Sequence, residues 1–139
     1  MPNTSPRTVP ASARLGPGRK VLARGDTVAS FRMRITAGDT IAIGPGKIAL
    51  LEAVAQTGSL TAAAKSLGMS YRRAWMLLDE VNRSLKNPAV ASAKGGSHGG
   101  GSELTNAGRQ LIELYRRIES TAMQACASDI RKIFGLLAR

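Results

Sequence analysis

The fold is decided by residues 58–75, which read Gly-Ser-Leu-Thr-Ala-Ala-Ala-Lys-Ser-Leu-Gly-Met-Ser-Tyr-Arg-Arg-Ala-Trp. Ser59 is a good N-cap for a short helix, and Gly68 ends that helix. The apolar residues between them share one helical face: Leu60, Ala63, Ala64 and Leu67. Ser70 caps another helix only two residues after Gly68. Two helices joined by a glycine turn are typical of a helix-turn-helix.

Helical periodicity extends on both sides of this stretch. An earlier helix is predicted from Pro45, because proline suits the first helical position, to the residue before Gly58. The helix that Ser70 caps is predicted to continue to Asn87-Pro88 with one buried stripe, formed by Ala74, Leu78, Val81 and Leu85. Trp75 lies next to this stripe, and we interpret it as part of the core rather than as a contact residue.

Short strands are predicted before and after the helices. Residues 31–35 alternate apolar and charged side chains, residues 36–39 have turn chemistry, and residues 40–43 complete a hairpin. After Pro88, residues 89–94 and 102–105 flank the glycine-rich tip Gly-Gly-Ser-His-Gly-Gly-Gly and form a wing. The predicted fold is α+β: a winged helix-turn-helix with an N-terminal β-hairpin and a long C-terminal helix.

The composition favours a polyanionic partner. The chain has 139 residues, with 20 Lys and Arg against 9 Asp and Glu, which gives a net charge of +11. An anionic membrane is the competing polyanion, but no apolar run approaches the ~20 residues that span a bilayer. No secretory signal is visible, and the single Cys126 cannot form an internal disulfide. We therefore expect a cytoplasmic, nucleoid-associated protein that binds double-stranded DNA.

Three segments are expected along the chain. Residues 1–28 are predicted to be a basic disordered arm. Two interpretations of this arm are equally open: it contacts DNA, or it is a tail without a selected role. Residues 29–119 form the winged helix-turn-helix. Residues 120–139 extend the last helix, which Thr105 would cap and whose apolar stripe from Leu111 to Leu137 is longer than one small domain can cover. That excess predicts packing on a second copy, and hence a homodimer.

The first turn of the Ser70-capped helix carries an unusual charge pattern. A Glu three residues after the cap would complete a capping box, yet Arg72 and Arg73 occupy this turn. Two cations there oppose the helix dipole by roughly 0.3 to 1 kcal/mol each, which indicates an anionic partner. In a helix-turn-helix the second helix reads the major groove from this end.

The other predicted DNA contacts lie on the two helix starts and the wing. Tyr71 has a hydroxyl suited to a phosphate, and partial burial of its ring is the alternative. Ser59 fits both a phosphate contact and a plain cap. The complete predicted set is Ser59, Thr61, Ser70, Tyr71, Arg72, Arg73, Lys94, Ser97 and His98.

No catalytic, metal or cofactor site is predicted. His98 is the only histidine and has no cysteine, carboxylate or second histidine nearby in the sequence. The glycine tract does not match the GxxxxGK[ST] pattern of a phosphate-binding loop. An enzyme is therefore not expected.

Three motifs in order resemble the DNA-binding domain of the ModE-type molybdate-responsive transcriptional regulators. They are the stretch 58–75, the glycine tip at 95–101, and Leu-Thr-Asn-Ala-Gly at 104–108 followed by Tyr-Arg-Arg at 115–117. The helix-turn-helix is also similar to that of LysR-type regulators. The resemblance covers residues 31–119 and implies a dimeric winged-helix protein that binds a palindromic operator through residues 70–73 and the wing.

The chain departs from typical ModE regulators in one respect. Those proteins continue into a molybdate-binding region of small β-barrel repeats, whereas this chain ends at Arg139 within a helical stretch. We therefore do not expect molybdate binding. Two alternatives to a sequence-specific regulator remain: an architectural nucleoid protein that uses charge alone, and an oxyanion sensor in which Arg72, Arg73 or the wing glycines hold the anion.

Overall fold

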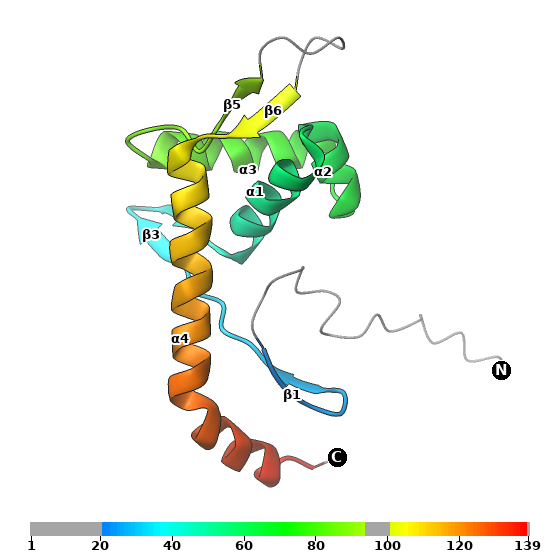
Figure 1. Cartoon of the computed structure of the whole chain (residues 1–139), viewed down its shortest axis with the longest axis vertical. Helices are drawn as coiled ribbons and strands as arrows, with labels where there is room; N and C mark the ends of the chain where they lie inside the picture. The colour runs from blue at the N-terminus through cyan, green and yellow to red at the C-terminus, as the bar shows by residue number, and fades with distance from the viewer. Residues whose placement is uncertain (1–20, 94–100, 139) are drawn as a thin grey trace, which may run out of the picture. The chain divides into compact units, whose positions relative to one another are not determined.

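The computed structural model describes residues 21–93 and 101–138 of the chain. These residues belong to two compact units. The larger unit is Arg32–Tyr115, and the smaller unit combines the described parts of Met1–Phe31 and Arg116–Arg139. The last helix, α4 (Asn106–Leu136), begins in the larger unit and continues in the smaller one (Figure 1).

The larger unit has the element order of a winged helix-turn-helix, as predicted. A small hairpin precedes three helices, and a second hairpin leads from the third helix into α4 (Figure 1). The elements before α4 are β3 (Ile35–Ala37), β4 (Thr40–Ile43), α1 (Pro45–Thr57), α2 (Leu60–Ser66), α3 (Tyr71–Ser84), β5 (Val90–Ala93) and β6 (Gly101–Leu104). Both hairpins are antiparallel.

Three predicted helix ends are confirmed by their capping geometry, whereas α3 ends at Ser84, before the predicted stop at Asn87, because Leu85 is already extended. Ser59 Oγ accepts a hydrogen bond from the Ala62 backbone N–H at 3.2 Å, and Ser70 Oγ accepts one from the Arg73 N–H at 3.1 Å. Gly58 closes α1 with φ of 70°, a left-handed conformation that favours glycine. Each cap therefore follows from residues visible in the sequence.

One hydrophobic core lies in the larger unit, with α1 at its centre. Ile48, Leu50, Leu51 and Val54 of α1 are fully buried. Other buried side chains come from the helix-turn-helix, the base of the wing and α4: Leu60, Ala63, Ala64, Ala74, Val81, Ala89, Val90, Leu104 and Tyr115. The Tyr115 hydroxyl donates to the Met33 carbonyl at 2.9 Å, so the polar end of this buried ring is satisfied.

The first hairpin of this unit is shorter than the sequence predicted. Strand β3 begins at Ile35 rather than at residue 31, and it includes Thr36 and Ala37, which were assigned to the turn. A two-residue turn requires a positive φ, and Gly38 supplies it at 60°. The strands therefore pair from Ala37 and Thr40 outward, with a bulge between Ile35 and Thr36.

The smaller unit corrects the predicted extent of the N-terminal arm. Strands β1 (Leu22–Arg24) and β2 (Thr27–Ala29) form a hairpin where residues up to 28 were predicted to be disordered. Gly25, with φ of 61°, allows the tight turn between them. Arg24 donates to the Phe134 carbonyl at 2.8 Å, and its guanidinium lies 5.8 Å from the centre of the Phe134 ring. Residues 1–20 lie outside the described part of the chain.

The wing is anchored to α3 by one side chain. Asn82 Oδ1 accepts hydrogen bonds from the backbone N–H groups of Ala89 at 2.9 Å and Val90 at 3.3 Å. Its Nδ2 donates to the Val90 carbonyl at 3.4 Å. Asn82 therefore fixes where β5 leaves the helix-turn-helix.

The return from the wing into α4 depends on a close backbone approach. The Thr105 N–H donates to the Ala89 carbonyl at 2.9 Å, and the Thr105 hydroxyl donates to the Pro88 carbonyl at 2.6 Å. A Cβ on Gly108 would lie 2.2 Å from the Ala89 carbonyl oxygen. Only glycine fits at this position without a backbone shift.

Replacing Asn82 should loosen the wing. Asn82→Leu leaves two partly buried N–H groups without an acceptor, so we expect a loss of about 1 to 3 kcal/mol in the free energy of unfolding. Urea denaturation followed by circular dichroism measures it. Asn82→Asp keeps the accepting oxygen and should lose clearly less. Equal losses in the two variants would contradict the anchoring role.

A methyl group at Gly108 should destabilise the fold. Gly108→Ala forces β5 away from α4, with an expected cost of about 1 to 3 kcal/mol by thermal or urea unfolding. Gly135→Ala is the matched control, because it is also in α4 but has no atom within 4 Å of the added Cβ. In that variant alanine should stabilise by up to about 1 kcal/mol. If Gly108→Ala leaves the free energy of unfolding unchanged or raises it, the backbone at Ala89 moves away without loss of stability.

Candidate nucleic-acid interface

The first turn of α3 presents a basic surface. Arg72 and Arg73 are both exposed, and this turn contains no acidic residue. Ser70 caps the turn through its side chain, so the cap needs no Glu three residues later. The positive helix end and two guanidinium groups therefore lie together, which suits phosphate oxygens and the acceptor groups of guanine.

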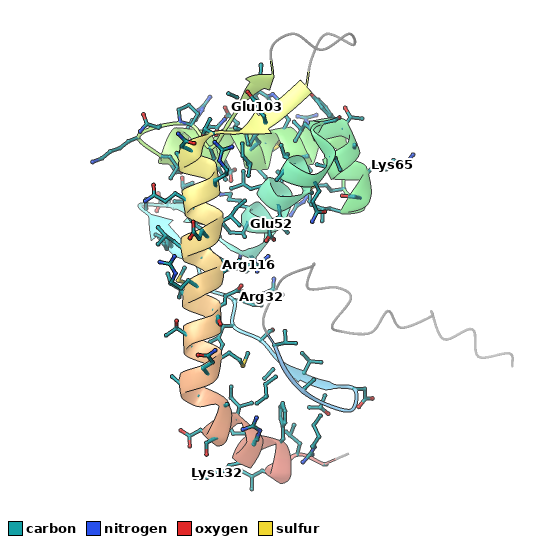
Figure 2. The ribbon with its side chains drawn as sticks, in the orientation of Figure 1. Arg32, Glu52, Lys65, Glu103, Arg116 and Lys132 are labelled. Atoms are coloured by element: carbon teal, nitrogen blue, oxygen red, sulfur yellow. The ribbon has the colours of Figure 1, made fainter. Side chains whose placement is uncertain are left out.

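The other predicted residues of the helix-turn-helix also reach the surface. Thr61 and Tyr71 are exposed, and Ser59 is half-buried because it caps α2. Lys65, in the last turn of α2, is a further exposed cation (Figure 2). The structure thus places polar and basic groups at the starts of both helices. Lys94, Ser97 and His98 lie outside the described residues.

Trp75 is not a core residue, and our sequence interpretation of it was wrong. Half of the side chain, 50%, is exposed, and its neighbours Tyr71 and Met76 are exposed to 54% and 49%. The reason is the narrowness of the buried stripe of α3, in which only Ala74 and Val81 are fully buried. Trp75 is one residue beyond Ala74, a rotation of about 100° around the helix, which carries it away from the core.

A buried cation that sequence reasoning missed holds α3 in place. Lys47 of α1 is almost completely buried, and its Nζ lies 2.8 Å from Glu80 Oε2 on α3. The same ammonium group donates to the Ile41 carbonyl of β4. Lys47 thereby joins three elements through charge-assisted contacts. A lysine within the apolar pattern of α1 was the available signal, but its partner on α3 is visible only in the folded chain.

The base of the wing is tied to the helix-turn-helix. Strands β5 and β6 pair in register from Val90 with Leu104 to Ala93 with Gly101. The Ser102 N–H donates to the Gly58 carbonyl at 2.9 Å, at the turn before α2. The wing therefore starts from a fixed position relative to both helices of the motif.

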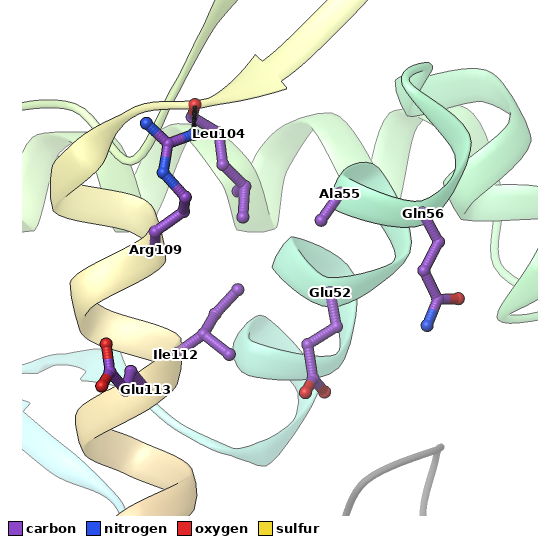
Figure 3. Close-up of a pocket in the computed structure, with 7 residues that line it drawn as sticks. All are labelled: Glu52, Ala55, Gln56, Leu104, Arg109, Ile112 and Glu113. Atoms are coloured by element: carbon purple, nitrogen blue, oxygen red, sulfur yellow. Dashed lines mark hydrogen bonds between the residues drawn. The ribbon is translucent and has the colours of Figure 1, made fainter.

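A separate groove lies between α1 and the start of α4 (Figure 3). It has a volume of about 300 Å³, and its lining residues are Glu52, Ala55, Gln56, Leu104, Arg109, Ile112 and Glu113. The Arg109 guanidinium donates to the Leu104 carbonyl at 2.9 Å and also contacts Asn106. Because two carboxylates line the groove and its arginine is already engaged, the groove is poorly suited to an oxyanion.

Within residues 21–93 and 101–138, no cluster of three or more His, Cys, Asp or Glu side chains is positioned to hold a metal ion. A helix long and apolar enough to cross a membrane is likewise not found in this part of the chain.

Comparison with known proteins agrees with this geometry. Residues 46–109 match the family model of the bacterial regulatory helix-turn-helix proteins of the lysR family. A molybdenum-pterin-binding protein, MopB of Rhodobacter capsulatus, is 42% identical over 62% of this chain and 32% of its own length. The DNA-binding transcriptional dual regulator ModE of Escherichia coli K12 is 38% identical over 61% of this chain and 34% of its own length.

The chain spans about a third of the length of these two curated relatives. A solved complex of the CbnR DNA-binding domain with DNA aligns with a TM-score of 0.49 and 25% identity, covering 63% of this chain and 95% of that domain. The resemblance to ModE and to LysR-type helix-turn-helix proteins that the sequence predicted is confirmed. Residues 46–109 are thus similar to the helix-turn-helix of the lysR family of bacterial regulatory proteins.

Proposed function

We propose that this chain is a sequence-specific DNA-binding transcriptional regulator of the ModE type, which binds a palindromic operator as a homodimer. The observation that carries the proposal is the exposed pair Arg72 and Arg73 in the first turn of α3, beside a cap that Ser70 already satisfies. Association with the nucleoid would follow from DNA binding.

Electrostatics supports this assignment. Each arginine near the positive end of α3 costs roughly 0.3 to 1 kcal/mol against the helix dipole, and no acidic residue in that turn compensates. An anionic partner offsets that cost. Double-stranded DNA suits a chain with a net charge of +11, because neutralising phosphates releases condensed counterions.

The relatives support regulation of transcription more than binding of molybdenum. The ModE relative is named a DNA-binding transcriptional dual regulator, and the matching family model describes regulatory helix-turn-helix proteins. Molybdenum-pterin binding belongs to the name of MopB, of which this chain covers only about a third. The proposed function is therefore built on the regulatory and DNA-binding descriptions of these relatives.

A homodimer would cover the apolar residues that α4 leaves in water. Four large apolar side chains on this helix are at least 43% exposed, and Leu137 follows directly after it: Leu114, Ile118, Ile133 and Leu136. Several large apolar side chains exposed on one helix are typical of an interaction surface. A two-fold contact uses the same surface twice and would set two α3 helices about one DNA turn, ~34 Å, apart. The expected operator is therefore symmetric.

Removing either arginine should weaken operator binding. Arg72→Ala and Arg73→Ala are each expected to cost about 1 to 3 kcal/mol of binding free energy, measured by fluorescence anisotropy on a duplex selected by the wild-type chain. Circular dichroism should show an unchanged fold, because both side chains are exposed. Unchanged affinity in both variants would exclude α3 as the reading helix.

Lys94→Ala provides a contrasting control for the arginines. As a phosphate contact from the wing, Lys94 should contribute equally to all duplexes, and its loss should lower the slope of log affinity against log salt by about one. A loss confined to the selected duplex would instead assign base reading to the wing.

Placing a charge in the apolar stripe of α4 should separate the dimer. Ile118→Asp is expected to shift the chain toward monomer in sedimentation velocity at micromolar concentration, because the carboxylate would be buried in the interface. Operator affinity should fall although no DNA-facing residue has changed. Gln124→Asp adds the same charge at an exposed polar position of α4 and should leave the dimer intact. A wild-type chain that sediments as a monomer and binds one copy per site would exclude the dimer.

A further inference from the structure

We infer that Trp75 and Met76 form an apolar contact that reads the 5-methyl groups of thymine beside the base contacted by Arg72. The inference rests on the proposed function, since it requires α3 to enter the major groove. It adds two residues that sequence reasoning did not place at the DNA.

The first observation is the exposure of these side chains. Trp75 and Met76 are 50% and 49% exposed although both are large and apolar. The core contacts a different side of α3, where Ala74 and Val81 are fully buried. About half of each residue therefore presents apolar surface to solvent, where a partner of α3 can contact it.

The second observation is that Arg72 lies on the same face of α3 as Trp75 and Met76. Trp75 and Met76 follow Arg72 by three and four residues, so all three side chains share one face of the helix. Arg72, Arg73 and Met76 also line one hollow of about 250 Å³ on the surface of α3, together with Ser70, Leu77 and Glu80. Met76 thus lies beside both arginines in this hollow.

The chemistry of the major groove limits what such a surface can contact. Base edges there present donors and acceptors, and the one apolar group of the four standard bases is the thymine methyl. Phosphates have no apolar surface on which a thioether or the face of an indole can pack. A purely apolar protein partner is disfavoured, because Arg72 and Arg73 would be buried beside it without anions. Charge complementarity therefore favours thymine-containing DNA as the occupant.

The experiment uses the full chain and a duplex enriched by it from a randomised pool. The enriched duplex is synthesised with thymine and, at each position in turn, with deoxyuridine, which lacks only the methyl group. For the wild-type chain we expect about a fourfold loss of affinity for each contacted methyl, the equivalent of ~0.8 kcal/mol for one buried carbon. Fluorescence anisotropy measures the affinity.

Trp75→Ala should bind the thymine duplex more weakly and should no longer distinguish thymine from deoxyuridine at the affected position. Trp75→Phe keeps an apolar ring and should retain part of the discrimination. Arg72→Ala should lose affinity yet keep the thymine preference, which separates the apolar contact from the charged one. Sedimentation and circular dichroism of Trp75→Ala should match the wild-type chain.

Each other outcome overturns the inference in a recognisable way. If a duplex is enriched but deoxyuridine is tolerated at every position, base reading by the chain stands and the methyl contact is wrong. If Trp75→Ala alters the oligomeric state, the exposed ring belongs to a protein interface. If no sequence is enriched from the pool, the proposed function fails together with the inference.

Discussion

The narrow apolar stripe that holds α3 to the core is the constraint on which the rest of the structure depends. Only Ala74 and Val81 are fully buried along this helix, and Leu77 and Leu78 pack partly against the same core. A small alanine at the centre of the contact lets α3 lie close to its neighbours while most of its circumference faces solvent. Lys47 then fixes the helix further, because its ammonium group joins Glu80 of α3 to the carbonyl of Ile41. The basic first turn is thus displayed on a helix that is held firmly.

The wing and α4 are tied to the same frame through backbone groups as well as through the shared core. Asn82 accepts from two consecutive N–H groups at the start of β5, and Thr105 donates to the two carbonyls just before it. Gly108 allows the first turn of α4 to approach Ala89 closely. These contacts are local and directional, so they determine where the wing begins.

The sequence predicted the helices of this domain well because their ends depend on local chemistry. Ser59, Ser70 and Gly58 act on backbone groups within four residues, so their roles are readable without the fold. The position of Trp75 was not predictable in this way, since an aromatic residue beside an apolar stripe fits a wide buried face as well as a narrow one. Lys47 was missed because its partner Glu80 is distant in the sequence. The hairpin from Leu22 to Ala29 was missed because three-residue strands carry little periodicity.

The composition of the α3 surface also bears on whether the chain reads sequence or only binds charge. An architectural protein that uses phosphate contacts alone gains affinity from lysine and arginine, and an exposed indole adds nothing to such contacts. Here a Trp and a Met lie on the same helical face as Arg72, at the end of α3 that enters the groove in a helix-turn-helix. Leaving about half of each large apolar side chain in water is unfavourable relative to burying it. Base edges in the major groove combine an apolar methyl group with nearby anionic phosphates, whereas the sugar-phosphate backbone offers no such apolar group. The surface therefore favours base reading over binding by charge alone.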